Sequence, residues 1–93
     1  MGNFNSGQLK RLKEIFEELE YQVIFGKGQF KSGYCIIQDK KMIVVNKYFD
    51  TDGKVETLLE IMDQIEDPKE ILLSKPSMKY LHKLYERITE IKN

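Results

Sequence analysis

The fold is decided by the stretch Gly26-Lys-Gly-Gln-Phe-Lys-Ser-Gly-Tyr-Cys-Ile-Ile-Gln-Asp-Lys-Lys-Met-Ile-Val-Val-Asn-Lys-Tyr-Phe49. It contains two β-rich apolar runs, 34–38 and 42–48, and the three residues between them are few enough for a hairpin. If Asp39 and Lys40 form the turn, the predicted register pairs Ile37 with Met42, Ile36 with Ile43, Cys35 with Val44 and Tyr34 with Val45. A different loop length would exchange the two faces.

Both faces of this hairpin are predicted to be apolar. One face holds Cys35, Ile37, Met42 and Val44, and the other holds Tyr34, Ile36, Ile43, Val45 and Phe49. An antiparallel sheet usually leaves one face polar. We therefore expect helices on both faces, or helices on one face and another subunit on the other.

The segments around the hairpin read as one strand and several helices. Apolar residues at spacings of three and four predict an amphipathic helix over roughly 6–20, capped by Ser6. The run 21–25 predicts a first strand that ends at Gly26. Asp50-Thr-Asp-Gly53 provides caps for a second helix that reaches about residue 66.

Two further helices are expected near the C-terminus. Asp67 is a candidate cap with Pro68 as the first helical residue, so 71–73 reads as a short helix rather than a strand. Ser77 is the candidate cap of the last long helix. The predicted fold class is α+β: a three-stranded antiparallel β-meander with an N-terminal helix and two main C-terminal helices, in the order αβββα(α)α. Residues 1–93 form a single domain, with 1–5 expected to be flexible.

Composition narrows the class of protein. With 93 residues, 41% hydrophobic and 32% charged, the chain has the composition of a soluble globular domain. No apolar run is long enough to cross a bilayer, no secretory signal is visible, and the single cysteine excludes an internal disulfide, so a cytoplasmic location is the default expectation. A chain this short leaves much of its surface in water, which favours a second copy or another protein as a partner.

Charge is unevenly distributed along a chain whose formal net charge is zero. Residues 21–49 carry five lysines against one aspartate, a net charge of +4, whereas residues 50–70 carry two lysines against eight acidic residues, a net charge of −6. We interpret this as a basic sheet region and an acidic helical region that compensate each other within the fold.

The spacing and number of candidate residues argue against several kinds of metal and catalytic site. If Gly53 occupied the glycine position of an EF-hand, Tyr48 and Leu59 would stand at ligand positions that their side chains cannot fill. Cys35 and His82 are single members of their kinds, which excludes metal sites built from several Cys or His ligands. A nucleophilic Cys35–His82 pair is disfavoured because an apolar strand blunts thiol reactivity. No catalytic residue, cofactor or metal site is expected.

A phosphate or nucleic-acid site is the alternative to a purely structural role for the glycines and lysines. Glycines and lysines in 26–33 can present amides and ammonium groups to an anion, although their order is wrong for a Walker loop. Aromatic residues interleave with lysines, as on stacking platforms, but a pI near 6.6 limits the basic footprint to one local patch. The candidate ligand residues are Lys27, Lys31, Tyr34, Asn46 and Lys47.

The element order, about 8–62, resembles the core of restriction-endonuclease-like nucleases. Those families place an aspartate on the second strand and Glu-x-Lys or Asp-x-Lys on the third, where two carboxylates hold magnesium. Val45-Asn46-Lys47 keeps the lysine without a carboxylate two places before it, and Tyr34-Cys35 stands where the aspartate is expected. The resemblance therefore implies an inactive relative. Phe30–Cys35 and Val44–Lys47 are also similar to segments of small uncharacterised bacterial proteins, which implies no function.

From these observations we expect a non-catalytic binding or interaction module. Self-association as a homodimer is the favoured partnership, another protein is a second, and no membrane partner is expected. The alternative function is nucleic-acid or phosphate-ligand binding through the lysine and aromatic surface of the central sheet, on what would be a degenerate nuclease-like fold.

Overall fold

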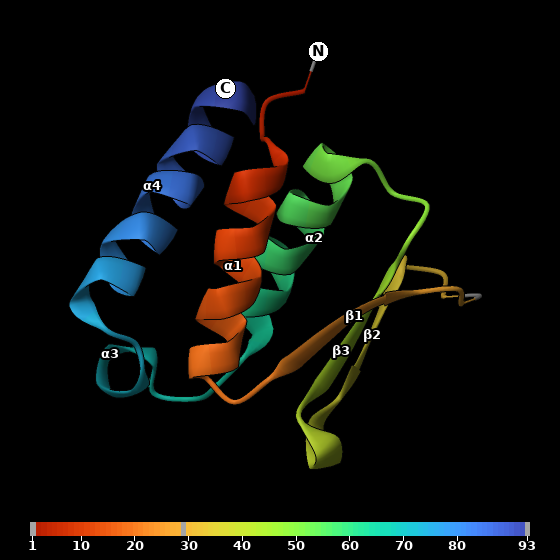
Figure 1. Ribbon diagram of the computed structural model, residues 1–93, viewed down its shortest axis with the longest axis horizontal. Coiled ribbons are helices and arrows are strands. Elements are labelled where there is room, and N and C mark those ends of the chain that lie inside the picture. The colour runs from red at the N-terminus through yellow and green to blue at the C-terminus, as the bar shows by residue number, and fades with distance from the viewer. Residues whose placement is uncertain (1, 29, 93) are drawn as a thin grey trace.

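The computed structural model describes residues 2–28 and 30–92. It is an α+β structure (Figure 1), whose elements in chain order are α1 (Ser6–Glu18), β1 (Gln22–Gly26), β2 (Tyr34–Ile37), the 3-10 turn η1 (Gln38–Lys40), β3 (Met42–Asn46), α2 (Thr51–Gln64), α3 (Lys69–Leu72) and α4 (Lys75–Lys92). The expected order of helices and strands is confirmed at this level. Residues 71 and 72 lie in a short helix rather than a strand, and Leu73 follows that helix in an extended conformation.

The sheet is mixed, so the predicted antiparallel meander is wrong. Its strand order is β1-β3-β2, with β3 in the centre. β2 and β3 form the predicted antiparallel hairpin, and its register, from Tyr34 opposite Val45 to Ile37 opposite Met42, is confirmed. β1 instead pairs in parallel with β3, with Val23 beside Ile43 and Phe25 beside Val45.

The connection between β1 and β2 explains this departure. Sequential strands usually pair, which favours β1 beside β2. Residues 27–33 are long enough to carry the chain past the end of β3, whose amide at Lys47 donates to the carbonyl of Gly26 over 3.1 Å. β3 then takes the central position, where alternate residues Ile43 and Val45 are fully buried.

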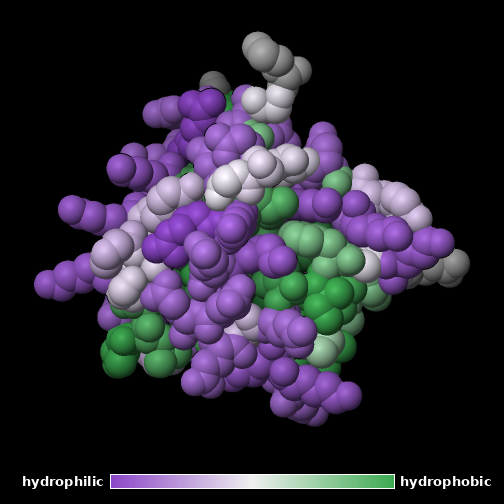
Figure 2. Space-filling view, viewed as in Figure 1, coloured by the Kyte–Doolittle hydropathy of each residue, from purple (hydrophilic) through white to green (hydrophobic). Residues whose placement is uncertain are grey.

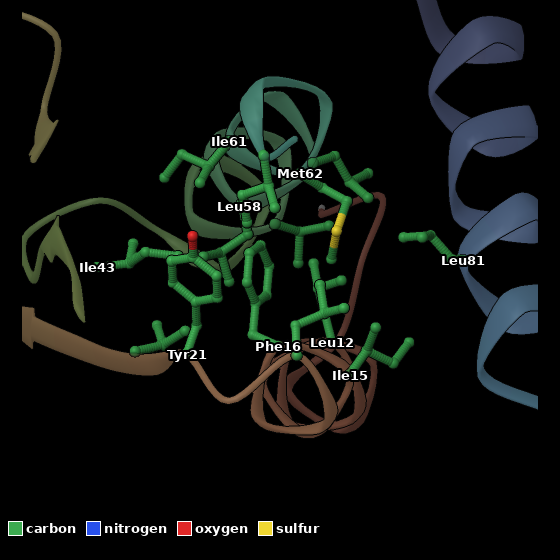
Figure 3. Packing of buried hydrophobic residues seen from close by; sticks show 14 of the residues in the cluster. Leu12, Ile15, Phe16, Tyr21, Ile43, Leu58, Ile61, Met62 and Leu81 are labelled. Carbon is green, nitrogen blue, oxygen red and sulfur yellow. The ribbon is translucent and has the colours of Figure 1, made fainter. Parts of the chain in front are cut away.

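Three layers make up the molecule. α1 and α2 cover one face of the sheet, and α4 lies on the far side of these two helices (Figure 1). Figure 3 shows the single core between them: Phe16 and Leu12 of α1 meet Leu58 and Met62 of α2, with Ile43 of the sheet on one side and Leu81 of α4 on the other. The expectation that helices cover both faces of the sheet is wrong for the described residues, because α1, α2 and α4 all lie on one side.

The first two long helices begin with side-chain caps. Asn5, one residue before the predicted Ser6, caps α1: its Oδ1 accepts from the amide of Gln8, and the Gln8 side chain accepts from the amide of Asn5. Asp50 caps α2 through a 2.7 Å bond from the amide of Gly53, as predicted. The amide of Phe4, a buried residue, donates to Asp52 over 2.8 Å and joins the N-terminus to α2.

The starts of α3 and α4 differ from the predictions. No side chain caps α3, and Asp67 instead forms an ion pair with Lys41. α4 begins at Lys75, where the Ser74 hydroxyl accepts from the amide of Ser77. Ser77 lies inside the first turn of α4 and is fully buried against α1. Its hydroxyl forms hydrogen bonds with Arg11 and Glu18 of that helix.

Candidate interaction surfaces

The face of the sheet that turns away from the helices is the first candidate, and we call it the open face. The register places on it Gln22, Ile24 and Gly26 of β1, Met42, Val44 and Asn46 of β3, and Cys35 and Ile37 of β2. Ile37 is 37% exposed, and Ile24, Cys35, Met42 and Val44 are half-buried by their neighbours. The centre of this face is therefore apolar and accessible.

The open face also lacks charge. Given that 32% of the chain is charged, eight surface positions would carry roughly two or three charged residues, yet these eight carry none. Absence of charge around an apolar centre is the composition found in the cores of protein–protein interfaces. It is not the composition of an ordinary solvated sheet face, which is polar.

A basic surface lies at one end of the sheet, and we call it the lysine end. Three strand ends meet there, because the amide of Asn46 donates to the carbonyl of Gly33 and that of Lys47 to Gly26. Lys27, Lys31 and Lys47 are exposed around this junction. Hydrophilic side chains gather at the corresponding right-hand edge of Figure 2. The predicted lysines thus converge at the end of the sheet rather than on its face.

The other two predicted ligand residues lie near the lysine end but have structural contacts. Tyr34 faces the helices, and its hydroxyl accepts a 2.7 Å bond from Nε2 of Gln64. The Oδ1 atom of Asn46 accepts from the amide of Tyr48 over 2.9 Å, which fixes the turn after β3. Of the five predicted ligand residues, the three lysines are therefore the charged ones at this surface.

Sequence reasoning missed a polar cluster at the opposite end of the sheet. Nζ of Lys41 lies 3.0 Å from Oδ2 of Asp67 and 5.3 Å from the centre of the Tyr21 ring, and the Tyr21 hydroxyl donates to Asp67 over 3.4 Å. The bond from Lys41 lowers the pKa of Asp67. Burial raises the pKa of Tyr21, and neighbouring Asp67 adds to that rise. The cluster ties the β2–β3 turn to the segment after α2.

Acid pH should lower the free energy of unfolding partly because it protonates Asp67 in this cluster. A carboxylate with a depressed folded pKa contributes stability above its ordinary pKa of 3.8, and that contribution is lost as pH falls through the lower folded value. We expect Asp67→Asn to lower the free energy of unfolding at neutral pH by no more than about 1 kcal/mol. We also expect a shallower loss of stability below about pH 4.

Urea unfolding measured from neutral to acid pH checks this prediction. The control is Asp39→Asn, in the adjacent exposed turn, because Asp39 makes no ion pair in the described part of the chain. If the free energy of unfolding fell equally with decreasing pH in Asp67→Asn and in the unmodified chain, the cluster would contribute nothing to the pH dependence of stability.

A second unpredicted polar network joins α1 to the start of α4. Nη2 of Arg11 donates to the buried Ser77 hydroxyl over 2.9 Å, and Ser77 in turn donates to Glu18. The amide of Ser74 donates to Oε1 of Glu18 over 3.0 Å. Burial raises the pKa of Glu18, but the bonds from Ser77 and Ser74 outweigh that effect and lower it overall. The network satisfies groups buried between two helices, which is a structural role.

The residues considered for catalysis and metal binding are not brought together. Cys35 lies on the open face, whereas His82 is exposed on α4, and α1 and α2 separate the two (Figure 1). Both carboxylates of Asp50-Thr-Asp52 accept bonds from backbone amides. Within residues 2–28 and 30–92, no three His, Cys, Asp or Glu side chains are placed to hold a metal ion.

Comparisons with known proteins identify no relative: no family model, no curated protein and no solved structure matches the chain. The resemblance to restriction-endonuclease-like nucleases therefore stays a prediction. None of the described helices combines the length and apolar character needed to cross a membrane. The open face and the lysine end are thus the two surfaces from which a function can be argued.

Proposed function

We propose that this chain is a non-catalytic interaction module that pairs with a second copy of itself through the open face. The observation that carries the proposal is an accessible apolar sheet face without a single charged residue. In a two-fold symmetric dimer the same patch meets itself, so a charge near the symmetry axis would face its own copy. The open face has no charge that could cause such repulsion.

Charges at the two ends of the sheet favour one way of stacking. The lysine end carries Lys27, Lys31 and Lys47. At the turn between β2 and β3, the acidic residues Glu20, Asp39, Glu66 and Asp67 outnumber the basic residues Lys40 and Lys41. Glu20 lies close enough to Lys41 to raise the pKa of the lysine, and Glu66 lines the same hollow as Gln38 of the turn. Antiparallel stacking of two sheets brings each basic end over the end with the excess of acidic residues. Parallel stacking brings like charges together.

The size of the face indicates a weak dimer. Three strands of about five residues span roughly 14 by 16 Å, so the face has an outline of roughly 220 Å² per copy. Stable complexes bury about 800 Å² per partner. We therefore expect a dimer that dissociates on dilution.

The exposed apolar pair Ile71 and Leu72 of α3 is the competing surface. Ile71 is 81% exposed and Leu72 43%, and the hydrophobic atoms at the lower left of Figure 2 lie over α3. A four-residue helix gives this patch much less area than three strands give the open face. A test of self-association has to separate the two surfaces.

We expect Val44→Lys to weaken self-association at least tenfold, because it places a like charge at the centre of both copies. Sedimentation velocity over a wide range of protein concentration measures the effect, and circular dichroism verifies that the variant folds. Ile71→Lys is the matched control, since it adds the same charge to the rival patch, and it should associate like the unmodified chain.

Cys35 provides an independent probe on the open face. Pairing through this face should slow alkylation of its thiol as protein concentration rises, and Val44→Lys should remove that dependence. A mass of one chain at every concentration would refute the proposal, and so would loss of association in Ile71→Lys with none in Val44→Lys.

A further inference from the structure

The lysine end holds more positive charge than the sequence indicated. Besides Lys27, Lys31 and Lys47, two lysines from the helices approach it. Nζ of Lys13 in α1 lies 5.1 Å from the centre of the Phe25 ring, and Nζ of Lys54 in α2 lies 4.8 Å from it. Phe25 immediately precedes Gly26, the last residue of β1. Four separate segments therefore bring five ammonium groups to this side of the molecule.

Among the described residues, Lys27, Lys31 and Lys47 form no ion pair. The ion pairs found, Arg11–Glu18 and Lys41–Asp67, lie away from the lysine end. Asp50, the acid nearest to Lys47 in sequence, accepts a backbone amide bond at the start of α2, and Glu17 lines the same hollow as Lys13 on the helix side. A chain with no net charge thus gathers cations in one place, where their mutual repulsion favours an anionic ligand.

An exposed aromatic ring stands beside these cations. Tyr48 is 68% exposed, and Nζ of Lys47 lies 5.2 Å from its ring centre. The bond from its amide to Asn46 fixes the backbone on which the ring is mounted. Burial does not explain a ring with so much of its surface in water, since the core is complete without it. An exposed ring next to a cation can serve as a stacking platform for a nucleobase.

We propose that the lysine end binds single-stranded nucleic acid, with Tyr48 stacking on a base and Lys27, Lys31 and Lys47 contacting phosphates. Lysines spread around three strand ends suit a phosphate chain better than one small anion, which needs converging donors. A base in a duplex is already stacked, so an exposed ring with flanking cations favours a single strand. This inference does not depend on self-association through the open face.

Fluorescence anisotropy with a labelled oligothymidine of about 12 nucleotides tests the proposal, a length within the usual range for single-strand binding. Titrations at several salt concentrations from roughly 50 mM upward give the slope of log affinity against log salt. Removing two phosphate contacts with Lys31→Ala/Lys47→Ala should reduce the magnitude of that slope by about 1.4. Lys79→Ala/Lys83→Ala, which removes two exposed lysines of α4, is the matched control and should leave the slope unchanged.

Tyr48 separates base stacking from simple charge attraction. Tyr48→Ser should weaken binding of the oligonucleotide roughly five- to a hundredfold, while Tyr48→Phe keeps it. Heparin, which has charge but no bases, should bind Tyr48→Ser and the unmodified chain alike. No binding at low salt would overturn the proposal. So would equal losses in the two lysine double variants or unchanged oligonucleotide binding in Tyr48→Ser. Competition by inorganic phosphate far below the sodium chloride concentration of equal effect would also overturn it, because it would indicate a site for one small anion.

Discussion

Replacing Gly33 with alanine should lower the free energy of unfolding by about 2–4 kcal/mol, a large loss for a substitution of one methyl group. Gly33 has φ +85°, a conformation that disfavours any residue with a β-carbon. A β-carbon there would also lie 2.2 Å from Cζ of Phe49, so the ring would have to move. Backbone strain and overpacking act together at the start of β2.

Gly26 provides a matched control in the same sheet. A β-carbon on Gly26 meets its nearest neighbour, Cγ1 of Val44, at an ordinary 3.7 Å, and its φ is not positive. Gly26→Ala should therefore change stability by less than about 1 kcal/mol. Urea denaturation followed by circular dichroism measures both variants. Similar losses for the two would contradict a special role for Gly33, whereas partial recovery of Gly33→Ala by Phe49→Leu would identify the ring contact.

The hairpin could be predicted because its determinants are local. Two apolar runs separated by three residues leave few registers, and the alternation of side chains then assigns each residue to a face. The structure has the predicted pairs from Tyr34–Val45 to Ile37–Met42. Lys41 adopts the left-handed conformation, φ 48°, that closes η1 without a glycine, so the usual Asn-Gly signature is absent.

The place of β1 could not be predicted in the same way. A strand's own residues do not reveal which neighbour it pairs with, and the preference for sequential neighbours favoured the wrong partner. Whether β1 pairs with β2 or with β3 depends on the path of the connection between β1 and β2. The pairing of β1 with β3 also shapes the open face, because it places Ile24 there, on the side of the sheet opposite the helices.

Candidate site residues were predictable where charge alone identified them. Lys27, Lys31 and Lys47 cluster in sequence, and the strand ends also bring them together in space. Lys41 and Asp67 are 26 residues apart, and no local sequence pattern predicts their ion pair. The approach of Lys13 and Lys54 to Phe25 likewise depends on the packing of α1 and α2 against the sheet. Sequence patterns therefore located the basic surface but underestimated its charge.

Truncating Phe16 to alanine should cost about 3–5 kcal/mol, because its ring is fully buried. Figure 3 shows the ring between α1 and α2, beside Tyr21 at the entry to the sheet. A domain of this length has a free energy of unfolding of about 5–14 kcal/mol, so the variant loses a large share of it. Phe16→Leu, which keeps most of the apolar contact, should lose about 1–2 kcal/mol.

The cooperativity of unfolding of Phe16→Ala is also predicted. Because α1, α2 and the sheet share a single core, loss of Phe16 should destabilise all of them together. Helical circular dichroism and tyrosine fluorescence, in a chain without tryptophan, should therefore report one coincident transition at a lower urea concentration. Phe30→Ala, which truncates a partly exposed ring outside that core, should cost less than half as much. Separate transitions in Phe16→Ala would mean that the sheet folds without the helices, and then the open face and the lysine end would belong to an independent unit.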